Sequence, residues 1–158
     1  MKTTLLVILL CVLQIAATDD SPTGREEEAL KQATDRFMAK MADKQLAEAI
    51  SDLTDRYWYD RSELAKTKAA TIAQFAPELA KAENKMGPPL PNGYEFLGTK
   101  RIGKSTVRLV YLQKYANFIL PWSFTFYKAK DKFKLVNVDF GDSVADDLKT
   151  FTVTEPAR

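Results

Sequence analysis

A run rich in proline and glycine, from Gly87 to Gly93, divides this chain into two parts with different hydrophobic periods. Before the run, apolar residues recur at the spacing of amphipathic helices, and thirteen alanines lie between Ala29 and Ala82. After it, apolar and polar residues alternate as in strands, and eleven of the seventeen aromatic residues lie between Tyr94 and Phe140. Helices followed by strands predict an α+β fold, with the change from helix to sheet inside the irregular run.

The first part of the chain predicts three helices. Thr23 and Glu26 have the spacing of a capping box, so the first helix should begin there and reach about residue 42. A shorter helix follows over roughly 46–53. The third should begin after Asp60, whose spacing to Glu63 is that of a second capping box, and should end near residue 85.

The second part predicts four strands joined by short connections, which indicates a curved antiparallel meander. The expected strands are 94–101, 106–115, 118–128 and 133–140. In the third strand, alternate residues form an apolar stripe that a central strand would bury: Phe118, Leu120, Trp122, Phe124 and Phe126. Pro121 cannot donate a ladder hydrogen bond, so a bulge or bend is expected there.

The N-terminal segment 1–17 is typical of a secretory signal peptide. One positive charge precedes an apolar run too short for a stable membrane span, and small residues precede Asp19. We therefore expect an exported protein, periplasmic or extracellular. The remaining regions would be a polar tail at 18–24, a single α+β domain at 25–141 and a C-terminal tail at 142–158, in which Phe151 and Val153 could dock.

Two residue types needed by many active sites are missing from the expected domain. The chain has no histidine, and its single cysteine, Cys11, lies in the expected leader. Cysteine nucleophiles, Ser-His-Asp triads and Cys/His zinc sites therefore cannot be built. No calcium-loop pattern occurs, so neither a metal nor a cofactor is expected. A net charge of +2 gives no basic excess of the kind that nucleic-acid binding requires.

Two groups of residues are candidate site residues. The cluster Tyr57–Asp60 could line a pocket for a ring-containing or lipidic ligand; alternatively, its rings fill the helix–sheet interface while Asp60 caps the third helix. In the last strand, Asn137 and Asp139 share the parity of Leu135. Facing a cavity, Asp139 could act as a general base, whereas facing water it would only be solvated. Trp122, beside the expected bend, is the stripe residue expected to reach a cavity.

The order of elements resembles the nuclear transport factor 2-like superfamily, a group of cone-shaped folds that includes ketosteroid isomerases, SnoaL-type cyclases and exported proteins. The stretch from Phe37 to Asp60 looks like the family's link from the first to the second helix and into the pocket wall. The closing stretch 133–140 is similar to its last strand. The resemblance covers roughly 25–141 and implies a four-stranded cone around the first helix, with a cavity at the open end and dimers through the outer sheet face.

Three functions remain open on this basis. The leading hypothesis is a non-catalytic binding or interaction module for a small apolar or aromatic ligand, with a pocket formed by Tyr57, Tyr59, Trp122 and Asn137. One alternative is an isomerase- or cyclase-type enzyme with Asp60 or Asp139 as the base. The other is a protein-binding or inhibitory module that uses its strand edges or hairpins.

Overall fold

The computed structural model describes residues 22–58, 60–144 and 148. The expected signal peptide at 1–17 lies outside the described residues, as do Tyr59, Phe151 and Val153. No helix in the described part of the chain is long and apolar enough to cross a membrane.

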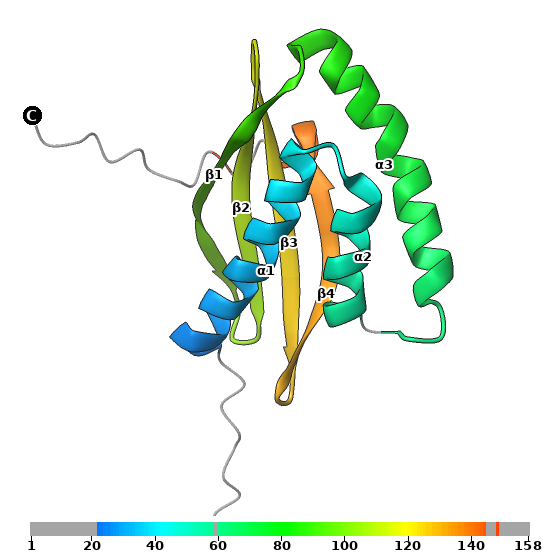
Figure 1. The fold of residues 1–158 in the computed structure, drawn as a ribbon. Coiled ribbons are helices and arrows are strands. Elements are labelled where there is room, and N and C mark those ends of the chain that lie inside the picture. Colours follow the sequence, from blue (N-terminus) through cyan, green and yellow to red (C-terminus); the bar gives the residue numbers. More distant parts are fainter. Residues whose placement is uncertain (1–21, 59, 145–147, 149–158) are drawn as a thin grey trace, which may run out of the picture.

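Three helices precede an open, four-stranded antiparallel sheet with strand order β1-β2-β3-β4, which confirms the predicted α+β class and meander (Figure 1). The elements are α1 (Gly24–Ala42), α2 (Leu46–Tyr57), α3 (Leu64–Met86), β1 (Pro89–Ile102), β2 (Thr106–Tyr115), β3 (Ile119–Ala129), β4 (Lys132–Phe140) and a short 3-10 helix, η1 (Gly141–Val144). Helices α1 and α2 cover one face of the sheet, which we call the inner face.

The two predicted capping boxes have different outcomes. At α1 the box is confirmed, because the Thr23 hydroxyl accepts from the Glu26 N–H and the Glu26 carboxylate accepts from the Thr23 N–H at 2.8 Å. At α3 the prediction is wrong, because the helix begins at Leu64 and Asp60 does not cap it. The Asp60 carboxylate instead accepts from the N–H and the hydroxyl of Ser62 at 2.9 and 2.7 Å, a local turn that competes with capping. These hydrogen bonds lower the pKa of Asp60.

Strand β1 begins inside the run that was expected to be irregular. It starts at Pro89, opposite Tyr115 of β2, and its register shifts before Tyr94. Because β1 is an edge strand, a proline there need not donate a ladder hydrogen bond, and the shift absorbs the additional residues. The prediction that the strand starts at residue 94 is therefore wrong.

The prediction of a bulge at Pro121 is also wrong. The pairing of β2 with β3 passes Leu112 and Pro121 without a shift. The irregularity lies in β4, because consecutive β3 residues Thr125 and Phe126 face residues 137 and 135, which leaves Val136 as an additional residue. A β-bulge of this kind reverses the side-chain alternation beyond it.

The Val136 bulge corrects the predicted parity of the last strand. Leu135 points to the inner face and is 1% exposed. Asn137 and Asp139 lie opposite outer-face residues of β3, so they do not share the face of Leu135. Val138 points inward in their place.

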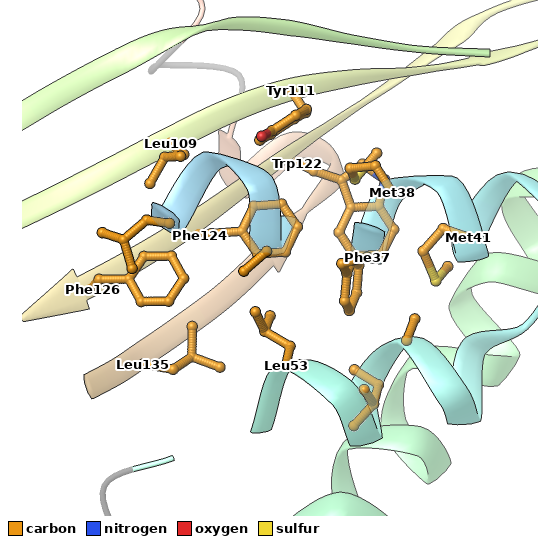
Figure 2. Packing of buried hydrophobic residues seen from close by; sticks show 14 of the residues in the cluster. Phe37, Met38, Met41, Leu53, Leu109, Tyr111, Trp122, Phe124, Phe126 and Leu135 are labelled. Atoms are coloured by element: carbon orange, nitrogen blue, oxygen red, sulfur yellow. The ribbon is translucent and has the colours of Figure 1, made fainter. Parts of the chain in front are cut away.

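Aromatic rings fill the inner face of the sheet. Figure 2 shows Phe37 of α1 packed against Trp122 and Phe124, with ring centroids 5.6 and 5.0 Å apart. Four of the five residues in the predicted β3 stripe are buried. The exception is Phe118, which is 66% exposed because β3 begins one residue later.

A buried polar group joins α1 to the centre of the sheet. The Tyr111 hydroxyl donates to the Asp35 carboxylate at 2.9 Å and lies 2.7 Å from the Thr34 hydroxyl. Tyr111 is fully buried, and this burial raises the pKa of its phenol. The phenol therefore stays neutral and fixes α1 on β2 through its hydroxyl.

Replacing Tyr111 with phenylalanine should lower the free energy of unfolding by about 1–2 kcal/mol, because two hydrogen-bonding partners in α1 lose the hydroxyl. Urea unfolding followed by circular dichroism measures the change. Tyr127→Phe, at a tyrosine that is 45% exposed, is the matched control and should cost much less. Equal losses in the two variants would contradict the role given to the buried hydroxyl.

Candidate functional site: a cleft between α3 and β4

Helix α3 lies beside the open edge of the sheet rather than over its centre (Figure 1). It packs mainly against α2, where Lys68 donates to the Asp55 carboxylate at 2.6 Å and to the Ser51 hydroxyl at 3.0 Å. In α3, all of which the structure describes, Phe75 alone is buried. A long helix held in this way leaves an opening between itself and β4.

That opening is a cleft of about 640 Å³, which we call the α3–β4 cleft. Its apolar floor comes from four elements: Ile50, Leu53, Phe75, Leu120, Leu135, Val138 and Phe140. Along α3, the wall carries a polar stripe: Thr71, Gln74, Glu78, Lys81 and Lys85. The volume lies within the range of ligand sites, and an apolar floor with a few polar groups is their usual composition.

The cleft also exposes the edge of β4. Val138, from the inner face, and Asn137 and Asp139, from the outer face, all line it. Because residues of both faces line one cleft, the cleft opens onto the strand edge between them. On this edge, the described residues provide a single bridge, in which Trp58 pairs with Leu135 in the parallel sense.

The predicted site residues occupy three different environments. Trp122 is fully buried and donates through Nε1 to the Gln113 side-chain oxygen at 3.0 Å, and the Tyr57 ring packs edge-on against Phe126 with centroids 5.3 Å apart. Neither residue lines the α3–β4 cleft. Asn137 and Asp139 do line it, and the Asn137 amide donates to the Asp139 carboxylate at 2.5 Å.

Of the other two candidate residues, one does not line the cleft and the other is not among the described residues. Asp60 lies in the linker between α2 and α3, where its carboxylate is used by Ser62. Tyr59 lies outside the described residues. Among the described residues of the predicted aromatic cluster, their neighbour Trp58 is the one that lines the cleft.

Sequence reasoning did not assign α3 to the site. The sequence shows apolar residues at helical spacing from Leu64 to Phe75, but the position of the helix beside β4 depends on tertiary contacts that spacing does not encode. In the structure, the α3 residues that belong to the hydrophobic core or pack against it are Ile72, Phe75, Leu79, Ala82 and Met86.

Among the described residues, no group of three or more His, Cys, Asp or Glu side chains is placed to hold a metal ion. Comparison with known proteins finds no matching family model, curated protein or solved structure.

Proposed function

We propose that this chain is an exported, non-catalytic binding module of the nuclear transport factor 2-like type, and that the α3–β4 cleft is its ligand site. The observation that carries the proposal is the cleft itself, an apolar floor bounded by a polar helix wall and an open strand edge. The order of three helices and a four-stranded meander supports the family assignment. The leader-like sequence of residues 1–17 supports export.

The filled inner face supports placing the ligand in the cleft. In the cone arrangement that the resemblance implies, the sheet packs around the first helix, and in this chain Phe37, Trp122 and Phe124 are in contact across that interface. All three side chains are at most 1% exposed. The available volume lies instead at the sheet edge, outside that packed interior.

Binding is better supported than the isomerase or cyclase alternative. That alternative needs an aspartate base with a tyrosine donor beside the same ligand. Here Asp139 lines the cleft and accepts from Asn137, whereas Tyr57 packs against Phe126. Asp60 accepts from Ser62 in a turn.

Replacing Ala82 with tryptophan tests the proposed site. Ala82 lines the cleft and is half-buried, so a larger side chain should fill the space without removing a core residue. The neutral fluorescent probe N-phenyl-1-naphthylamine should bind the unchanged protein, and Ala82→Trp should weaken this binding by about tenfold or more. Fluorescence titration measures both affinities.

The matched control is Ala80→Trp, which adds the same side chain at an exposed position of α3 outside the cleft. Its affinity for the probe should stay within about twofold of the unchanged protein. Failure of the unchanged protein to bind, or the same affinity in both tryptophan variants, would reject the cleft as the ligand site.

A further inference from the structure

We propose that the α3–β4 cleft binds an extended peptide segment of another protein, which adds as a fifth strand beside α3 to the edge of β4, where the described residues provide only the Trp58 bridge. This inference rests on the proposed function, because it names the partner of the same site. The peptide would carry apolar side chains at alternate positions and a carboxylate at its C-terminal end.

The first support is that β4 is an edge strand of the sheet. An edge strand presents a row of backbone N–H and C=O groups that can pair with another chain. The cleft opens onto this row, since Val138 and Asp139, from opposite faces of β4, both line it. In strand addition, the backbone supplies hydrogen bonds while alternate side chains enter pockets on one face.

The bridge between Trp58 and Leu135 shows how such a chain would lie. At this point, the segment after α2 already pairs with the β4 edge, in the parallel sense. The bridge lies at Leu135, in the first half of β4, and residues 137–140 follow it along the strand. A peptide that continues this line would run parallel to β4, with its C-terminus toward Phe140.

The position of α3, which extends beyond the last strand of the sheet (Figure 1), supports the same partner. Helices pack on sheets through an apolar stripe, and α3 carries one of which Phe75, Ala82 and Met86 line the cleft. Ala82 and Met86 are only half-buried, because α3 lies beside β4 rather than over a further strand (Figure 1). A fifth strand would bury these side chains and complete the layer below the helix.

Charge favours a peptide in this orientation over a neutral apolar molecule. Lys85 lines the cleft near the end of β4, since the neighbouring Met86 carbonyl accepts from Asn117 just before β3. Glu78 forms an ion pair with Lys81 at 2.8 Å, and the Asp139 carboxylate accepts from Asn137. Lys85 has no ion pair among the described residues, so it can receive the carboxylate of a parallel peptide.

Alternately N-methylated peptides test strand addition. The probe is a fluorescein-labelled synthetic heptapeptide, Thr-Val-Thr-Val-Thr-Val-Glu, with a free C-terminus. One version is N-methylated at the valines and the other at the internal threonines, so each loses internal hydrogen-bond donors of one strand edge only. Because only one edge would face β4, one version should bind about tenfold or more weakly, and the other within about threefold of the parent. Fluorescence anisotropy measures the affinities.

Two protein variants test the site and the orientation. Ala82→Trp should abolish peptide binding, and Lys85→Met should weaken it by about fivefold for the free acid and much less for the C-terminal amide. Lys66→Met is the matched control, at an exposed lysine of α3 outside the cleft, and should change nothing. Equal losses for the acid and the amide would reject the orientation.

The outcomes separate this inference from the proposed function. If N-phenyl-1-naphthylamine binds in an Ala82→Trp-sensitive way but the parent peptide does not bind at about 1 mM, the cleft is a small-molecule site and the peptide proposal is wrong. If both methylated peptides bind like the parent, or both bind equally weakly, strand addition is wrong. If neither probe binds, both proposals are wrong.

Discussion

Replacing Trp122 with alanine should lower the free energy of unfolding by about 3–5 kcal/mol, a large part of the stability of a domain of this size. The side chain is fully buried, and its ring contacts those of Phe37, Phe75 and Phe140 at centroid distances of 5.6, 6.1 and 4.7 Å. Alanine would leave a cavity between α1, α3 and the sheet. It would also leave the Gln113 side-chain oxygen without its 3.0 Å donor.

Urea denaturation at constant temperature measures the loss, and Phe118→Ala provides the control. Phe118 is another large apolar residue of the predicted stripe but is 66% exposed, so its removal should change the free energy of unfolding by less than about 0.5 kcal/mol. A loss below about 1 kcal/mol for Trp122→Ala would show that the inner face is not packed as described.

Replacing Lys128 with methionine should have the second largest effect on stability, about 2 kcal/mol. The Lys128 ammonium donates to the Glu26 carboxylate at 2.9 Å, and its side chain is only 9% exposed. The same carboxylate accepts from Thr23 in the capping box, so one ion pair joins the end of β3 to the start of α1. Methionine keeps the apolar stem of the side chain and removes the charge.

The pH dependence of stability should change with it. Hydrogen bonds from Thr23 and Lys128 lower the pKa of Glu26 in the folded protein. A lowered pKa stabilises the fold above the ordinary pKa of a glutamate, and this stabilisation is lost as the pH falls through the lower value. The difference between the unchanged protein and Lys128→Met should therefore shrink below about pH 4. Lys132→Met, at an exposed lysine, should cost little at any pH; a constant difference for Lys128→Met would contradict the coupling to Glu26.

The spacing of apolar residues in the sequence predicted the type and order of the three α-helices and the four strands, because burial on one face of each element imposes that spacing, but it did not predict η1. Phe37 and Phe124 illustrate it, since helical spacing in one and alternation in the other place both rings in the same core. The Thr23–Glu26 capping box was also visible, because it depends on residues three apart.

Features that depend on pairing between distant segments were not visible in the sequence. The additional residue Val136 reverses the alternation of β4, so Asn137 and Asp139 reach the cleft from the outer face rather than from the face of Leu135. No local signal distinguishes such a bulge from a regular strand. The cleft depends in addition on α3 packing against α2, which no periodicity specifies.

The two tryptophans of this chain give it a pair of intrinsic optical reporters. Trp122 is sealed in the core, whereas Trp58 lines the cleft and bridges to β4. Emission from Trp122 should respond to denaturant, and emission from Trp58 to occupancy of the cleft. The Trp58→Phe variant would retain only the Trp122 emission, so comparing it with the unchanged protein would assign the ligand-dependent and the denaturant-dependent changes to separate tryptophans.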